Sequence, residues 1–156
     1  RHITVTDVDG ETKMIESVVE WATSSVVLNA DVTDWHRAVG ASESLVIDTS
    51  GARITGRRLR DIDISSLGGT LTIDAIQTSW TKNNRRLVRI DSPQNNPVAV
   101  PLIADSGDIV SVSGLPASTT PQEVQFRFNR NMQNSDFTIT FILDDASTKT
   151  VTLTDL

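Results

Sequence analysis

Two aspartates near the start of the chain have the residue type and spacing of metal ligands. Asp7 and Asp9 lie two positions apart and are followed by a Gly-Glu pair, as at the start of a calcium-binding loop. Such a loop also needs further oxygen ligands and a bidentate glutamate at its twelfth position, and Glu20 falls two positions beyond that point. A calcium site at Asp7 and Asp9 is therefore one hypothesis, and an Asp-Gly hairpin turn is the interpretation that we favour.

A second pair of carboxylates, Asp61 and Asp63, lies on one strand-like segment. Residues two apart on a strand share a face, so these two side chains have the arrangement of paired catalytic acids. Arg58 and Arg60 precede the pair, and Arg89 lies in the similar segment 85–91. We therefore favour an exposed ladder of opposite charges over a catalytic pair.

Histidine and cysteine are too scarce to predict an enzyme. The chain has two histidines, His2 and His36, and no cysteine. A serine hydrolase needs an imidazole held against its nucleophile, and the Gly-x-Ser-x-Gly motif of one such arrangement does not occur. A conventional zinc site needs more His or Cys ligands than these. We expect no enzyme activity, no disulfide and no cofactor other than calcium.

Basic residues are concentrated in two segments. The clustered arginines are Arg53, Arg57, Arg58, Arg60, Arg85, Arg86 and Arg89. They could form a basic stripe that binds polyanions or an acidic neighbouring subunit, although long basic side chains also protect edge strands from unwanted pairing. The segments 57–63 and 85–91 resemble each other, which we attribute to two strands with similar edge chemistry. Trp35, in a polar connection, is a further candidate interaction residue.

Composition excludes several classes of protein. The net charge of −6 in 156 residues and the absence of tyrosine oppose nucleic-acid binding, which needs a concentrated positive field and aromatic stacking. A hydrophobic fraction of 38% is ordinary for a globular protein. No apolar run reaches the ~18 residues of a membrane span. No signal peptide is recognisable at the start.

Alternating apolar and polar residues predict strands along most of the chain. The C-terminal third is the strongest case, with runs over 124–128, 137–143 and 150–154, and shorter strands recur from Leu45 onward at intervals of about ten residues. We predict an all-β protein, an antiparallel β-sandwich of immunoglobulin-like type over 45–156. Residues 1–44 are predicted to form a strand and loop segment packed on this main domain. Trp21 and Trp80 are predicted to fill cores, and a phase shift at Ile76 predicts a bulge.

The segment 14–28 has two interpretations. Its many β-branched residues favour strands over 15–21 and 25–28, and one short N-terminal helix is the alternative. A strand is also predicted over 3–8, and 29–44 is predicted to be a connection.

Several of these strand segments carry a family resemblance. They are Leu45-Val46-Ile47-Asp48, the run 56–64, Leu71 to Ile76 with Ser79-Trp80, the run 84–87, Phe126 to Met132, and Phe137 to Phe141. Together they resemble the β-sandwich ectodomains of bacterial type IV pilin-like (prepilin) surface proteins. Those proteins begin with a long apolar helix that this chain lacks. The resemblance therefore implies either that such a helix was removed or that the chain is a globular partner of a separate helical subunit.

These observations lead to one expected function and two alternatives. We expect a structural or adhesive subunit of an extracellular filament or cell-surface appendage, which forms a homo-oligomer or filament with other protein subunits. One alternative is a virus-associated structural module of a phage tail or capsid decoration. The other is a carbohydrate-binding accessory domain that uses Trp35 with Asp7 and Asp9.

Overall fold

The chain contains two compact units, and each is described by itself. In this computed structural model the described residues are 2–7, 12–21, 24–33, 40–92, 97–99 and 103–156, with side chains from Gly40 onward except that of Ser113. The units are Arg1–Val39 and Gly40–Leu156. Strands make up 58% of the structure, and the described residues contain no α-helix, so the predicted all-β class is confirmed. No helix among these residues is long and apolar enough to cross a membrane.

The first unit is a three-stranded antiparallel sheet. Its strands follow chain order, as β1 (His2–Asp7), β2 (Thr12–Trp21) and β3 (Ser24–Thr33). Strands are thus confirmed over the ambiguous segment, and the alternative of a helix there is wrong. β3 also continues to Thr33, five residues beyond the predicted end of the strand at Leu28. Pairing of Thr33 with Thr12 of β2 extends the strand through a polar sequence that alone indicates a connection.

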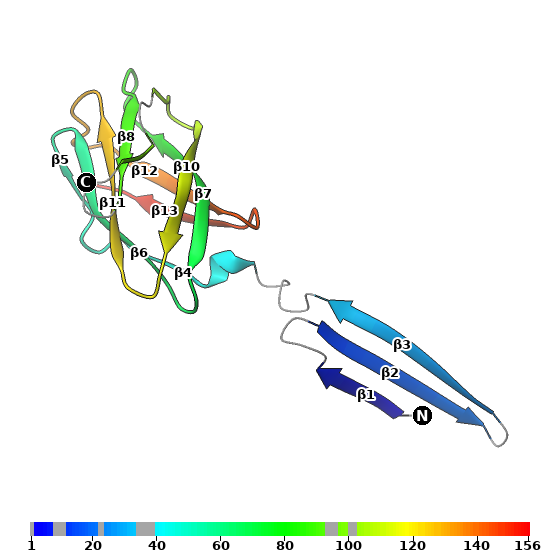
Figure 1. Ribbon diagram of the computed structural model, residues 1–156. Coiled ribbons are helices and arrows are strands. Elements are labelled where there is room, and N and C mark those ends of the chain that lie inside the picture. The colour runs from blue at the N-terminus through cyan, green and yellow to red at the C-terminus, as the bar shows by residue number, and fades with distance from the viewer. Residues whose placement is uncertain (1, 8–11, 22–23, 34–39, 93–96, 100–102) are drawn as a thin grey trace. The chain divides into compact units, whose positions relative to one another are not determined.

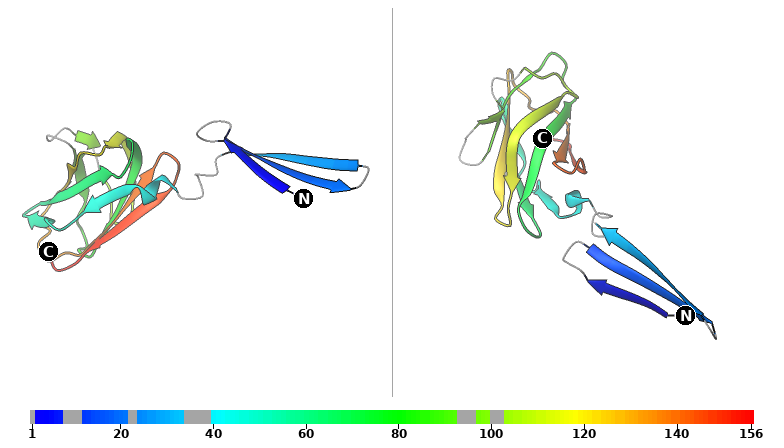
Figure 2. Two further views of the ribbon diagram at one scale, coloured as in Figure 1. Left: turned by 90° about the horizontal axis from the view of Figure 1, so that it is seen from below. Right: turned by 45° about the vertical axis from the view of Figure 1, so that its right-hand side comes forward.

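The second unit is a sandwich of two antiparallel sheets (Figures 1 and 2). The six-stranded sheet has the order β4 (Leu45–Asp48), β6 (Arg58–Ser66), β11 (Gln122–Phe128), β8 (Leu87–Asp91) and β9 (Pro97–Ala99), with β5 (Arg53–Thr55) also paired to β6. The four-stranded sheet has the order β10 (Ile109–Ala117), β7 (Leu71–Trp80), β12 (Phe137–Leu143) and β13 (Thr148–Leu153). The order β4-β6-β11-β8 over β7-β12-β13 matches the A-B-E-D and C-F-G sheets of an immunoglobulin sandwich, with β10 added beside β7.

Aromatic side chains fill the core between the two sheets. All four phenylalanines are at most 1% exposed, and Trp80 is 8% exposed, as predicted for a core residue. The Trp80 ring lies edge-on to Phe128, with centroids 5.1 Å apart, and Phe128 also contacts Phe137 at 5.7 Å. Since Phe128 belongs to the six-stranded sheet and the other two rings to the four-stranded sheet, these contacts join the layers.

Bulges explain two breaks in the alternation. On β6, Leu59 and Ile62 are both buried although three residues apart, because Asp61 adopts a positive φ of 58° and the register against β11 shifts there. The Asp61 N–H donates to Glu123 Oε1 at 2.9 Å, which holds the bulge. On β7, the pairing with β12 shifts between Ile73 and Ala75, so the predicted bulge near Ile76 is confirmed.

The segment 82–84 is not the hairpin turn that its Lys-Asn-Asn sequence indicates. β7 and β8 belong to different sheets, so the segment carries the chain from one layer of the sandwich to the other. Asn84 has a φ of 57°, which asparagine tolerates better than most residues. The local turn signal is correct, but the pairing partner of β8 is β11.

The turn between β12 and β13 anchors the start of the second unit. Asp145 Oδ1 accepts the Ser147 N–H at 2.9 Å, and Asp145 Oδ2 accepts the Ala41 N–H at 2.9 Å. Ala41 opens a short 3-10 helix, η2 (Ala41–Glu43). Asp145 therefore has a turn role, as is typical of an aspartate between two strands.

Candidate functional site

The outer face of the six-stranded sheet carries many charged side chains. Along β11, Val124, Phe126 and Phe128 are buried in the core, so Glu123 and Arg127 face outward. The same alternation applies to the neighbouring strands. We use the term charged face for the outer surface formed by Asp48, Arg53, Arg58, Arg60, Asp61, Asp63, Arg89, Glu123 and Arg127, together with Asp91, which is 8% exposed and forms an ion pair with Arg89.

Three arginines of the charged face form one row across three strands. Arg127 of β11 is the direct cross-strand partner of Arg58 on β6 and of Arg89 on β8. Side chains at such positions lie about 5 Å apart at Cβ, and like charges there destabilise the sheet. Arg89 forms an ion pair with Asp91 on its own strand. Among the described residues, no carboxylate lies within ion-pair distance of Arg58 or Arg127. We call these three residues the arginine row.

Three carboxylates form a second row on the same face. Asp63 of β6 is the direct partner of Asp48 on β4 and of Glu123 on β11. Burial raises the pKa of Asp63, and the negative charges of Glu123, Asp48 and Asp61 raise it further. Its carboxylate is therefore the member of the row that is most costly to ionise. We call Asp48, Asp63 and Glu123 the carboxylate row.

Glu123 differs from Asp63 in its surroundings. Burial opposes its ionisation, but the hydrogen bonds from the Asp61 N–H and the Gln125 side chain, with the positive charge of Arg60, lower the pKa of Glu123 overall. Hydrogen bonds from the Ser50 backbone and side chain likewise lower the pKa of Asp48. The carboxylate row therefore contains two acids whose charge is supported by the protein and one, Asp63, whose charge is opposed.

The two rows lie at opposite ends of the charged face. Glu123 and Arg127 are four residues apart on β11, which corresponds to about 13 Å along a strand. An ion pair between Arg53 Nε and Asp61 Oδ2, at 2.8 Å, lies between the rows. Asp61 therefore lies in the bulge and forms an ion pair with an arginine. This arrangement corresponds to the ladder of opposite charges that we favour over a catalytic pair.

The two predicted arginine segments meet at one end of the sandwich. The Arg57 carbonyl accepts the Phe128 N–H at 2.8 Å, and the Arg86 carbonyl accepts the Asn129 N–H at 3.0 Å. Arg85 Nε donates to the Asn131 carbonyl at 3.3 Å. The two segments lead into or lie on β6 and β8, and these strands flank the same strand, β11.

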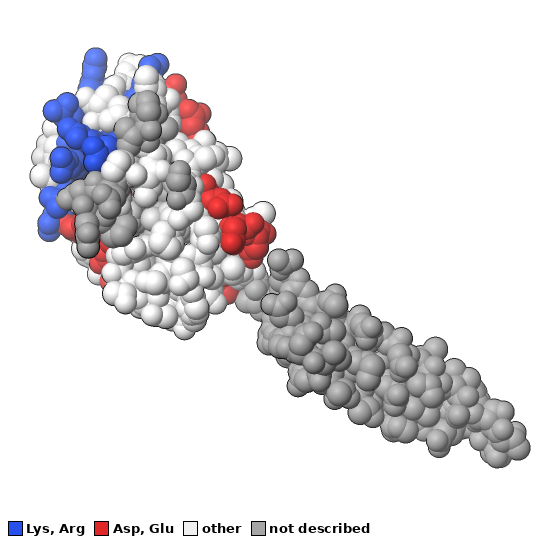
Figure 3. Space-filling view, in the orientation of Figure 1, with Lys and Arg blue, Asp and Glu red and all other residues white. Residues whose placement is uncertain are grey.

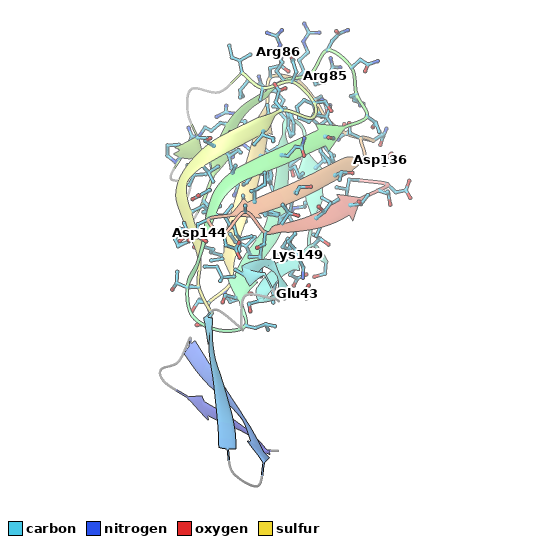
Figure 4. The ribbon with its side chains drawn as sticks, turned by 90° about the vertical axis from the view of Figure 1, so that its right-hand side faces the viewer. Glu43, Arg85, Arg86, Asp136, Asp144 and Lys149 are labelled. Atoms are coloured by element: carbon cyan, nitrogen blue, oxygen red, sulfur yellow. The ribbon has the colours of Figure 1, made fainter. Side chains whose placement is uncertain are left out.

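Charge is also unevenly distributed over the sandwich unit as a whole. In Figure 3, Lys and Arg side chains gather on one side of the sandwich unit, and most of the visible Asp and Glu lie on the other side. Figure 4 shows Arg85 and Arg86 at one end of the unit, with Glu43 and Asp144 toward the opposite end. Arg86 Nε pairs with Asp105 Oδ1 at 3.1 Å, so part of the basic end is neutralised within the chain.

Sequence reasoning singled out Asp63 but missed Arg127, Asp48 and Glu123. The alternation along 122–128 marks Arg127 as a polar-face residue, but only the strand order brings it between Arg58 and Arg89. Strand order in a sandwich depends on pairing between residues far apart in the chain. The alignment of Asp48, Asp63 and Glu123 also depends on pairing between distant strands, so the sequence alone does not predict it.

The other predicted site residues are not tested by the structure. Asp9 and Trp35 lie outside the described residues, and Asp7 is described only as the last residue of β1. β1 and β2 pair antiparallel on either side of 8–11, as an Asp-Gly hairpin requires. Within the described ranges, no three His, Asp or Glu side chains are placed to hold a metal ion. Asn134, Asp136 and Asp155 line a polar hollow of about 460 Å³.

The charged face can bind other charged groups. Arginine presents a planar fork of donors that suits carboxylates and phosphates, and the carboxylate row suits basic side chains. Comparison of the chain with protein families, curated proteins and solved structures finds no match. The resemblance to pilin-like ectodomains therefore stays a prediction, and the charged face is the feature from which a function can be inferred.

Proposed function

We propose that this protein is a structural or adhesive subunit of an extracellular filament or cell-surface appendage, which contacts other protein subunits through the charged face. One observation carries the proposal. The charged face places like charges directly opposite one another in two separate rows, with arginines in one and carboxylates in the other.

This arrangement is unfavourable for an isolated chain. Like charges directly opposite each other destabilise a sheet, whereas an opposite-charge pair stabilises it by roughly 0.2–1 kcal/mol, so alternating the two signs would remove the cost without loss of solubility. A partner with complementary rows would turn both repulsive rows into favourable contacts. Local rules of stability are most often broken at functional surfaces, so the rows support a binding role for this face.

Labelling of native material tests the proposal. An antibody raised against residues 40–156 should label filaments or another surface structure at regular intervals under the electron microscope. Label that is confined to the interior of the producing cells would contradict the proposal. Label on virus particles would instead support the alternative of a phage tail or capsid module.

Salt extraction provides a second readout on the same material. Contacts between exposed charges weaken when the Debye length falls from about 10 Å at 0.1 M salt to about 3 Å at 1 M. We expect concentrated salt to release this chain from the assembly more readily than mild detergent does.

A further inference from the structure

We propose that the partner of the charged face is a second copy of this chain, docked face to face about a twofold axis parallel to the two charged rows. This inference rests on the assembly role proposed above and names the partner and the contact. The observations that carry it are the registers that align the two rows and their placement at opposite ends of the face.

A twofold axis along the rows makes the charged face complementary to itself. Such a rotation reverses the strand direction and leaves the side-by-side order of the strands unchanged. On β6 and β11, the two strands that carry members of both rows, each carboxylate then lies over an arginine of the other copy, so Asp63 faces Arg58 of the second copy. Glu123 faces Arg127 of the second copy in the same way. This is an isologous interface, in which one contact occurs twice.

Charge balance distinguishes this arrangement from its alternative. The charged face has five arginines and five carboxylates, so two docked copies form a neutral interface. A twofold axis along the strands would place arginine row on arginine row and carboxylate row on carboxylate row. That arrangement brings like charges together, whereas the axis along the rows sets Asp63 and Glu123 against arginines and leaves Asp48 of β4 and Arg89 of β8 at the margins of the contact.

The size of the face sets the expected strength of the contact. Four strands are about 19 Å wide, and the rows with their margins extend about 20 Å along the strands, which gives about 400 Å² per copy. A stable interface buries about 800 Å² per partner, so this contact is weak by itself. Weak, salt-sensitive contacts of this kind become effective when many copies are held in one assembly.

Two charge-reversal variants test the contact between Asp63 and Arg58. The variants are Arg58→Glu and Asp63→Arg, and the structure shows no hydrogen bond or ion pair of either side chain to the described residues. Sedimentation velocity of the full chain at concentrations up to about 1 mM is the measurement. The wild type should self-associate in ~20 mM salt and dissociate in ~0.5 M salt.

Each variant alone should lose self-association, because its two copies would bring like charges together at this contact. Arg58→Glu sets two carboxylates against each other, and Asp63→Arg sets two guanidinium groups against each other. An equimolar mixture of the two variants should regain association. In the heterodimer the introduced glutamate faces the introduced arginine at one contact, and the unchanged Asp63 faces the unchanged Arg58 at the other, so both contacts pair opposite charges. Association of the mixture at least tenfold stronger than that of either variant alone is the expected result. Circular dichroism of each variant checks that the fold is intact.

Lys149→Glu and Asp144→Arg are the matched controls. They make the same changes of net charge on β13 and on the turn before it, away from the charged face, and should associate like the wild type. A wild type that stays monomeric in both salts overturns the inference, as does a mixture no stronger than its components. If the wild type is monomeric while antibody still labels a surface structure, the assembly role stands with a different partner.

Discussion

The two outer faces of the sandwich are both polar, but one carries uncharged threonines and the other carries rows of like charges. On the four-stranded sheet, Thr138 pairs with Thr152 and Thr140 with Thr150, and the hydroxyls of the second pair are 2.8 Å apart. These two pairs, which we call the threonine rows, are uncharged, and the hydroxyls of the second pair form a hydrogen bond with each other. On the six-stranded sheet, the corresponding positions hold the arginine row and the carboxylate row.

This difference shows that solubility does not explain the charged face. The threonine rows keep an outer face hydrated without any repulsion between neighbours. The same fold could have used hydroxyls on both sides, yet the six-stranded sheet carries two repulsive rows. The contrast therefore predicts that pH, salt and charge reversal affect one face and leave the other unchanged.

The largest effect is expected in the core that both faces share. Phe128→Ala removes the ring that contacts Trp80 and Phe137 across the two layers. We expect a loss of about 3–5 kcal/mol in the free energy of unfolding, because the ring is fully buried and leaves a cavity. Urea denaturation monitored by Trp80 and the other tryptophans measures it. A loss below about 1 kcal/mol would mean that the two layers are not joined through this ring.

Asp145→Ala is expected to have the next largest effect. The Ser147 hydroxyl, the Ala41 N–H and the Ser147 N–H all donate to this carboxylate and lower the pKa of Asp145. Loss of these bonds should cost about 1–2 kcal/mol at pH 7. Because the folded-state pKa is lowered, this stabilisation is complete above the unfolded-state pKa and disappears as the pH falls through the folded-state value. Thermal unfolding of both proteins across this pH range should show the difference shrinking toward acid.

Asp63→Asn should increase the free energy of unfolding, in contrast to the two preceding variants. Its carboxylate is the central member of the carboxylate row, and burial with three neighbouring acids raises the pKa of Asp63. The variant should be more stable than the wild type by about 0.2–1 kcal/mol at pH 7. Because the folded-state pKa is raised, the wild type regains this stability as the pH falls through the raised value. The advantage of the variant should therefore vanish below the unfolded-state pKa, and an advantage that persists there would contradict the explanation.

Thr140→Val is expected to have the smallest effect and serves as the comparison for Asp63→Asn. Its hydroxyl is exposed and bonds to that of Thr150. We expect a change within about 0.5 kcal/mol that is the same at pH 4 and pH 7, because no titrating group is altered. A pH-dependent change would show that the threonine rows are coupled to the charges.

The sequence predicts the layers of this molecule better than its surface. The spacing of Phe126, Phe128, Phe137 and Phe141 identifies core positions, because a strand alternates its side chains whatever its neighbours are. The two arginine segments are also recognisable as a candidate surface. Their completion by Arg127 is not, because it depends on β11 lying between β6 and β8. The same kind of non-local pairing makes the segment 82–84 a crossing between sheets.

The end of the first sheet shows a second limit of sequence patterns. Residues 29–33 are polar enough to indicate a connection, yet β3 extends through them because β2 offers a paired edge as far as Thr12. Backbone pairing of this kind leaves no mark in composition. Asp9 and Trp35 fall outside the described residues, so their proposed roles stay predictions.

A concentration series of amide NMR spectra in low salt tests the central claim most directly. We expect shifts of the backbone signals of Arg58, Asp63, Glu123 and Arg127 as the chain concentration rises, and their reversal in ~0.5 M salt. The signals of the threonine rows on β12 and β13 should not move. Shifts centred on the threonine rows, or no shifts on either face, would contradict the account that the charged face is the assembly surface.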